Sequence, residues 1–326
     1  TAAAVIQENE DGSAKILSSI VSSQIKEHEK FGGVVPELAA RSHVENIDFI
    51  INKALSESKL SLTDMDGIAA TAGPGLMVCL TVGLNIGKSI AAFAKKPFVA
   101  VNHLEGHALS PGLENIIKFP YLLLLISGGH SQYLIVKDVN EYVQLGTTID
   151  DALGEAFDKT AKMLDLGYPG GPNIEKFSKL GDKNFYKLPQ PIINKAGCNL
   201  SFAGLKTAVL REAKNINGNQ KLKYNLAASF QYTINKILEK KTKEAMRQFK
   251  TKISNNEKMS FVVAGGVAAN LSIRENLKKV SAEMGFTPLF PNLKFCGDNA
   301  AMIAWAGIQR FKKKLVDNLD FVAKSR

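Results

Sequence analysis

Two histidines separated by three residues, His103 and His107, are the side chains in this sequence whose type and spacing most directly indicate chemistry. On an α-helix, residues four apart differ in direction by about 40°, so both imidazoles would leave one face and could share a metal ion. Glu105 lies between them and points about 200° away from His103. Zinc proteases with H-E-x-x-H place the glutamate directly after the first histidine, within reach of the metal-bound water. We therefore expect Glu105 to support the site from behind or to bond elsewhere.

The histidine pair has an alternative interpretation, because isolated pairs also occur as surface or capping residues. His103, His107 and His130, three of the five histidines, directly follow predicted strands, and strand ends are where α/β proteins gather functional groups. A metal ion needs a third ligand, and Asp298 stands just before an Ala-rich helical segment. The residue type favours a helix N-cap there, although a carboxylate has enough lone pairs to cap and to ligate.

Paired glycines after two buried runs form the second chemical pattern. Ser127–Gly129 follow "LLLLI", and Gly265 and Gly266 follow "FVVA" and open a helix. Turns without side-chain bulk let backbone N–H groups approach phosphate oxygens, and a helix N-terminus attracts anions. Either pair alone is a weak signal. Two pairs in separate segments predict a nucleotide held from two sides.

Three carboxylates, Asp151, Glu155 and Asp158, recur along one face of a predicted helix between the glycine pairs. Such a carboxylate can accept hydrogen bonds from ribose hydroxyls. The alternative is a solvated acidic face. "GLNIGKS" at 83–89 resembles a phosphate loop but has one residue too few between its glycines. We expect those glycines to allow close helix packing instead.

The elements that position these residues alternate between short β-branched or Leu-rich runs and longer helical stretches, which predicts an α/β fold. A helix over 35–55, a strand over 66–72, a helix over 79–96 and a strand over 97–102 lead to the histidines. Residues 120–138 are typical of a β-hairpin. We place an N-terminal lobe at 1–112 and a C-terminal lobe at 113–298, with a final helix over 299–326 packing back on the first lobe.

Composition restricts the class of protein. The three cysteines are far apart, which argues against a zinc ribbon or a disulfide framework and fits a reducing compartment. No signal peptide is visible, and no apolar run reaches the ~20 residues that a membrane helix needs. A net charge of +10 suits a polyanionic partner. The basic runs 239–252 and 310–314 are possible nucleic-acid contacts or, equally, solvated helix faces.

Together these segments carry a resemblance to a known family: "GGVVPELAARSH", "AGPGL", "NHLEGH", "LLISGGHSQYL", "GEAFDKTAKML", "YPGGPNIEK", "NLSFAGLKTAV", "VAGGVAAN" and "DNAAMIAW". The chain resembles, over nearly its whole length, the bacterial branch of the TsaD (Gcp/Kae/Qri) family of tRNA threonylcarbamoyladenosine transferases. The resemblance implies the two-lobed fold of actin, sugar kinases and Hsp70 (the ASKHA fold), with a nucleotide in the cleft. It also implies transfer of threonylcarbamoyl from threonylcarbamoyl-AMP to the adenosine 3′ of the anticodon in tRNAs that read ANN codons.

The resemblance also implies a set of site residues. His103, His107 and Asp298 become the ligands of one iron or zinc ion, which reverses the preference for a cap at Asp298. The implied substrate contacts are Leu125, Ile126, Ser127, Gly128, Gly129, Asp158, Gly171 and Asn270. Neither the residues nor the resemblance indicates the general base, and His130 is a candidate by its position. Gly171 is indicated by the resemblance alone.

The same resemblance implies partners for this chain and shows where its sequence differs from the family. It implies tRNA as substrate, a TsaB-like paralogue and a TsaE-like ATPase as bacterial partners, and the cytoplasm, with a mitochondrial or plastid matrix as alternative. The family opens with a strand similar to "GIETSCDDT", whereas this chain begins "TAAAVIQENEDG"; if that strand is absent from the protein, we expect doubtful activity. A metallopeptidase of the O-sialoglycoprotein endopeptidase type and a non-catalytic ATP-binding scaffold remain the alternatives.

Overall fold

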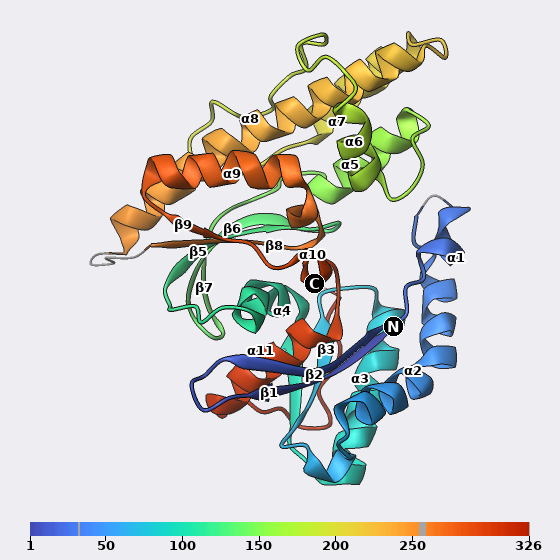
Figure 1. Ribbon diagram of the computed structural model, residues 1–326, viewed down its shortest axis with the longest axis vertical. Helices are drawn as coiled ribbons and strands as arrows, with labels where there is room; N and C mark the ends of the chain where they lie inside the picture. The colour runs from blue at the N-terminus through green and yellow to red at the C-terminus, as the bar shows by residue number, and fades with distance from the viewer. Residues whose placement is uncertain (32, 254–258, 326) are drawn as a thin grey trace. The chain divides into compact units, whose positions relative to one another are not determined.

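The computed structural model describes residues 1–31, 33–253 and 259–325 (Figure 1). The chain divides into two compact units, Thr1–Ile117 with Gly297–Arg326, and Lys118–Cys296. These boundaries differ from the expected lobes of 1–112 and 113–298. The difference matters at Asp298, which belongs to the first unit together with both histidines. The last helix ends at Lys312 and so is shorter than the expected 299–326.

The first unit contains two separate two-stranded sheets and the helices around them. An antiparallel pair, β1–β2, precedes a parallel pair, β3–β4, and helix α11 contacts strands of both pairs. The elements of this unit are β1 (Ala2–Glu8), β2 (Ala14–Val21), α1 (Ile25–Glu29), α2 (Pro36–Ser58), η1 (Leu62–Asp64), β3 (Ile68–Gly73), α3 (Met77–Ala94), β4 (Phe98–Asn102), α4 (His103–Leu109), η2 (Ser110–Leu113) and α11 (Ala300–Lys312).

Helix α3 packs closely against β3. Its buried residues form one stripe, in which a Cβ atom added at Gly87 would lie 2.8 Å from the Cβ of Ala70. The expectation that "GLNIGKS" serves helix packing is therefore confirmed at Gly87, whereas Gly83 has open space around it. Within the described residues, α3 alone is long and apolar enough to cross a membrane by length and composition. The same helix packs against β3 and α2 within the first unit.

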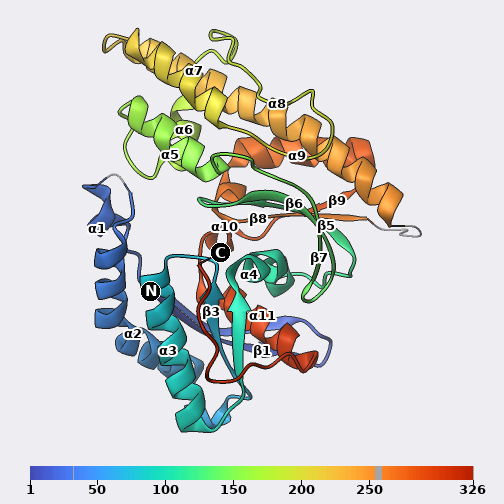
Figure 2. The ribbon, with the colours of Figure 1, turned by 180° about the vertical axis from the view of Figure 1, so that it is seen from behind.

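The second unit is built on a five-stranded sheet of order β7-β6-β5-β8-β9, with helices covering one face (Figures 1 and 2). The expected hairpin is present, because β5 pairs antiparallel with β6. On its other side β5 pairs parallel with β8, and β8 pairs parallel with β9. The elements are β5 (Tyr121–Ile126), β6 (Ser131–Asp138), β7 (Glu141–Thr147), α5 (Leu153–Met163), α6 (Gly170–Ser178), α7 (Ala203–Lys214), α8 (Gln220–Lys252), β8 (Ser260–Ala264), η3 (Gly266–Ala269), α9 (Leu271–Met284), β9 (Thr287–Leu289) and α10 (Leu293–Cys296).

The core of the second unit explains why its central strand is a continuous apolar run. Every residue of β5 is buried, and Leu122 and Leu124 join the helices in one apolar cluster. A strand that is buried on both faces has no need of alternating polar residues. Because β5 and β8 run in parallel, their carboxyl ends, and the glycine turns that follow them, lie at the same edge of the sheet.

Candidate active site

Helix α4 begins at His103 because the preceding residue caps it. The Oδ1 atom of Asn102, the last residue of β4, accepts hydrogen bonds from the backbone N–H of Leu104 at 2.8 Å and of Glu105 at 3.4 Å. A capping Asn satisfies N–H groups that have no partner inside the helix. The cap sets the first helical residue, so His103 and His107 lie one turn apart on the same face.

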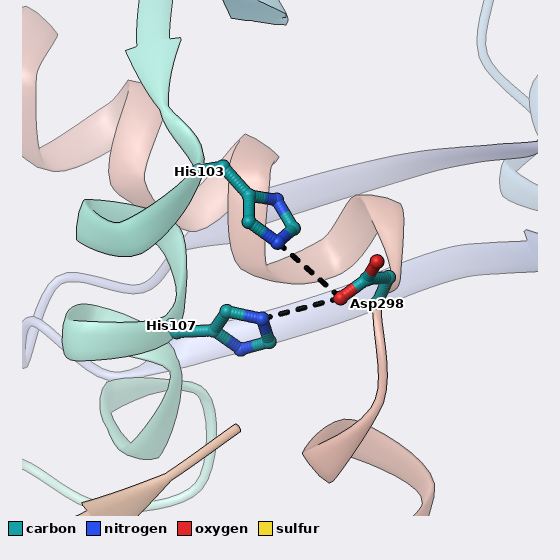
Figure 3. A group of neighbouring side chains, drawn as sticks. All are labelled: His103, His107 and Asp298. Atoms are coloured by element: carbon teal, nitrogen blue, oxygen red, sulfur yellow. Dashed lines mark hydrogen bonds and ion pairs between the residues drawn. The ribbon is translucent and has the colours of Figure 1, made fainter. Parts of the chain in front are cut away.

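Both imidazoles point at one carboxylate oxygen (Figure 3). Asp298 Oδ1 lies 3.2 Å from His107 Nε2 and 3.4 Å from His103 Nε2. One ligand atom from each of the three residues can be chosen so that all lie within 4.8 Å of one another. Two ligand atoms about 2.1 Å from a common ion, at a tetrahedral angle, are about 3.4 Å apart. The three predicted ligands therefore lie together as a group that could hold a metal ion.

The N-cap interpretation of Asp298 is wrong. The residue that caps α11 is Asn299, whose Oδ1 accepts from Met302 N at 2.9 Å. The Asp298 side chain is 79% exposed. Desolvation raises the pKa of Asp298, but hydrogen bonds and positive charge from His103 and His107 lower it by more, so the net pKa lies well below its ordinary value. Asp298 is thus an ionised carboxylate next to two imidazoles, as metal ligation requires.

The donor set fits a divalent transition metal. Two imidazoles and one carboxylate are ligands that both zinc and iron accept, and three protein ligands leave at least one coordination position for another group. His107 is fully buried, and its Nδ1 has no hydrogen-bond partner among the described residues. A buried polar atom without a partner costs folding free energy. The ring nitrogen that points at Asp298 is Nε2, so Nε2 is the atom that His107 offers to an ion.

Glu105 does not face the two imidazoles. Its carboxylate is buried and accepts a hydrogen bond at 3.0 Å from Nη1 of Arg310, on α11. The expectation that Glu105 bonds elsewhere or supports the site from behind is consistent with this contact. A carboxylate held in a buried ion pair is poorly placed to act as the general base of a peptidase, which argues against the metallopeptidase alternative.

The two glycine turns of the second unit lie side by side. Gly265 has a φ of +95°, and a Cβ atom there would lie 2.4 Å from the carbonyl oxygen of Ile126 and 3.3 Å from the Cβ of Ser127. Only glycine tolerates that combination of backbone angle and close approach. The start of α5 joins them, because a Cβ atom at Gly154 would lie 2.8 Å from the Cα of Gly128.

The turn after β5 offers fewer free donors than expected. The backbone N–H of Ser127 donates to the carbonyl oxygen of His130 at 2.7 Å, and Ser127 Oγ accepts from His130 N at 3.1 Å. The Ser127 N–H is therefore occupied, which corrects the expectation that Ser127 to Gly129 all donate to a phosphate. Gly128 and Gly129 have open space at Cα, and among the described residues their N–H groups have no partner. Leu125 and Ile126 are fully buried in β5, backbone included, and expose no surface to a ligand.

Asp158 and Gly171 meet at the start of α6. Asp158 Oδ1 accepts a hydrogen bond from Gly170 N at 2.7 Å, and burial raises the pKa of this carboxyl group despite that bond. A Cβ atom at Gly170 would lie 2.5 Å from the Cα of Asp158, whereas Gly171 has open space. The "PGGP" run was the signal that could have indicated Gly171. Its first glycine allows α5 and α6 to touch, and its second stays uncovered.

Asn270 is committed to the protein on both sides of its amide. Its Oδ1 accepts from Ile273 N at 2.9 Å and so caps α9, and its Nδ2 donates to Gln231 Oε1 at 2.8 Å. Of the three carboxylates predicted along one helix face, two are paired with lysines. Asp151 contacts Lys206, and Glu155 contacts Lys159. Of the three, only Asp158 is left for a nucleotide.

Some cations of the two basic runs are held by contacts within the chain. In 239–252, Lys241 is buried and donates to two carbonyl oxygens, and Lys243 pairs with Glu283 at 2.8 Å. In 310–314, Arg310 is held by Glu105, and Lys312 lies 2.7 Å from Glu8. These contacts favour the interpretation of both runs as structural or solvated helix faces over nucleic-acid contacts.

Comparison with known proteins identifies the family. Residues 15–305 match the TsaD family, described as tRNA N6-adenosine threonylcarbamoyltransferase. A protein of that name from Pelagibacter ubique (strain HTCC1062) is 60% identical over 326 residues, which cover all of this chain and 91% of the relative. The one from Rickettsia massiliae (strain Mtu5) is 50% identical over all of this chain and 94% of its own length.

Solved structures are similar in fold. The structure of HypF from T. kodakarensis aligns with a TM-score of 0.59 and 14% identity, over 83% of this chain and 44% of the HypF chain. A second HypF structure, in a phosphate- and nucleotide-bound form, aligns with a TM-score of 0.54 and 13% identity, over 84% of this chain and 41% of that chain. The expected ASKHA fold is confirmed. By sequence, this chain belongs to the TsaD family of tRNA N6-adenosine threonylcarbamoyltransferases.

Proposed function

We propose that this chain moves threonylcarbamoyl from threonylcarbamoyl-AMP to the exocyclic amine of the adenosine 3′ of the anticodon, in tRNAs that read ANN codons. Membership of the family supports the transferase activity itself. A donor that carries a phosphate is supported by one observation, the two glycine turns that lie side by side where β5 and β8 end. Turns of that kind suit the phosphate of an adenylate.

The metal site is part of the proposal. His103, His107 and Asp298 hold one divalent ion, iron or zinc, and a bound ion of either kind supplies Lewis-acid stabilisation of negative charge. The chain's own part is to fix the ligands. His107 is immobilised by full burial, His103 is 20% exposed, and the exposed flank of Asp298 faces solvent, where a substrate group can reach the site.

The second unit binds the donor molecule. The free N–H groups of Gly128 and Gly129 donate to the phosphate and stabilise the charge that grows as AMP leaves, because they are already oriented before the reaction. Asp158 keeps one carboxylate oxygen on Gly170 N and presents the other to the ribose hydroxyls. The uncovered Cα of Gly171 lets the ligand approach the start of α6. Asn270 Oδ1 uses one lone pair to cap α9, and its second lone pair accepts a hydrogen bond from the ligand.

The reaction with tRNA depends more on alignment of the attacking amine with the donor than on activation of that amine. An exocyclic amine is a weak nucleophile, so holding it against the donor carbonyl supplies much of the acceleration. His130, next to the turn of Ser127–Gly129, is the candidate for accepting the proton. We place the reaction in the bacterial cytoplasm, on the bacterial origin of the relatives, with a TsaB-like paralogue and a TsaE-like ATPase as partners. The net charge of +10 favours a polyanionic substrate.

The test is transfer by the purified full-length chain. The protein, with and without the two bacterial partners, is incubated with threonylcarbamoyl-AMP and unmodified tRNA, and the nucleosides are measured by mass spectrometry. We expect threonylcarbamoyladenosine in wild-type reactions, its loss in Asp298→Asn, and wild-type yield in Asp320→Asn, which alters an exposed carboxylate of the same unit. Cleavage of a peptide panel without any modified adenosine would contradict the proposal.

A further inference from the structure

The distance between α4 and α11 decides whether the three metal ligands meet. His103 and His107 lie on α4, whereas Asp298 directly precedes Asn299, the cap of α11 (Figure 3). The Asn299 bond to Met302 N makes the Asp298 backbone move with the first turn of α11. Metal–ligand distances in genuine sites lie within about 0.2 Å of their standard values. A small shift of one helix past the other would therefore separate the carboxylate from the imidazoles.

Two of the contacts between α4 and α11 come from the residues between the histidines. Glu105 and Arg310 form a buried ion pair, with side chains 2% and 13% exposed. Next to it, Gly106 lets the helices touch, because a Cβ atom there would lie 2.8 Å from Ile303 Cδ1 and 3.5 Å from Met302 Cγ. The spacing of "HLEGH" thus places two ligands on one side of α4 and two helix contacts on its other sides.

We propose that Glu105 and Arg310 are positioning residues of the metal centre, with Gly106 as the spacer that sets the distance between α4 and α11. The proposal rests on the metal site proposed above. Neither residue ligates the ion. Arg310 joins Glu105 to the helix that carries Asp298, and the pair sets metal affinity by holding the carboxylate within reach of both imidazoles.

The first test measures metal affinity in variants of the pair. Zinc binding to the metal-stripped full-length protein is measured by competition with a chromophoric chelator, for Glu105→Gln, Arg310→Met and the double variant. We expect roughly 10- to 100-fold weaker binding in Arg310→Met, as for other residues that support metal ligands, and a smaller loss in Glu105→Gln, which can still accept a hydrogen bond. The double variant is expected to bind no more weakly than Arg310→Met, because one interaction is removed in both.

The matched control is Lys312→Gln. Lys312 lies on the same helix, and its ion pair is with Glu8 of β1 instead of a residue of α4. We expect wild-type zinc affinity for this variant. Equal zinc affinity in wild type, Arg310→Met and Lys312→Gln would overturn the proposal, even if Arg310→Met unfolds more easily. A wild-type protein that binds no zinc and no iron would overturn the metal site itself, and the inference with it.

The second test varies the spacing without changing any charge, and it decides the matter if Arg310→Met does not fold. Gly106→Ala adds a methyl group against Ile303 Cδ1, and Ile303→Val removes that Cδ1 atom. We expect Gly106→Ala to weaken zinc binding by about 10-fold, and Gly106→Ala with Ile303→Val to regain most of it. A Gly106→Ala protein with wild-type zinc affinity would count against the spacer role, and an unrestored double variant would count against the spacing argument.

Discussion

Replacing either histidine by alanine should abolish metal binding, but the two variants should differ in stability. The His103 side chain is 20% exposed, whereas that of His107 is fully buried. Truncation of a large buried side chain typically costs about 2–5 kcal/mol. The buried Nδ1 of His107 has no partner among the described residues, so removing it offsets this loss of stability by about 1–3 kcal/mol. We expect His107→Ala to lower the free energy of unfolding by roughly 1–3 kcal/mol, and His103→Ala by less than about 1 kcal/mol.

The assay uses the single tryptophan as a local probe. Trp305 lies in α11 and is 5% exposed, and its indole Nε1 would be 2.4 Å from a Cβ atom at Gly112. Urea unfolding followed by its fluorescence, with a chelator present, reports on the first unit alone. Metal content is measured separately on the same preparations. Equal unfolding free energies for the two variants, or full metal content in His103→Ala, would refute the reasoning.

Three further predictions concern the second unit. Because burial raises the pKa of Asp158 in the folded chain, the stability that its neutral form contributes is present below the unfolded pKa and lost as pH rises through the folded pKa. Asp158→Asn should thus be at least as stable as wild type at pH 7 while transfer falls, and a variant less stable by more than ~1 kcal/mol would contradict the burial argument. Gly265→Ala should destabilise the unit by about 1–3 kcal/mol in urea unfolding, because φ is +95° there, whereas Gly266→Ala, with open space, should not; equal effects would be the contrary result. Burial raises the pKa of Cys198 to about 11, so unfolding free energy should fall as pH rises from 9 to 11, and Cys198→Ala should remove that part of the slope; identical pH profiles would show that Cys198 does not titrate in that window.

The sequence allowed the site's chemistry to be predicted where that chemistry depends on local spacing. Two histidines four apart on a helix must share a face, which follows from helix geometry alone. The glycine pairs predicted two turns around one nucleotide, and the structure adds the parallel pairing of β5 and β8 that brings these turns to one edge. The misplaced Glu105 could likewise be excluded as a peptidase base from its direction on the helix.

The rest depends on contacts between residues far apart in the chain. Residue type alone favoured a cap at Asp298, because nothing local indicates that the neighbouring Asn299 takes that role. The partner of Glu105 lies 205 positions away, and Arg310 looked like part of a basic surface run. The occupied N–H of Ser127 follows from the path of the turn to His130. Such contacts are set by packing, which periodicity and composition do not encode.

The most direct test of the account is to locate the ion. A crystal structure of the metal-loaded protein, with anomalous data on both sides of the zinc and iron absorption edges, gives the identity of the ion and its distances to the protein. The account predicts one peak per chain, about 2.0–2.2 Å from His103 Nε2, His107 Nε2 and a carboxylate oxygen of Asp298. A peak bound by other residues, or fully loaded protein with Asp298 outside the coordination shell, would contradict it.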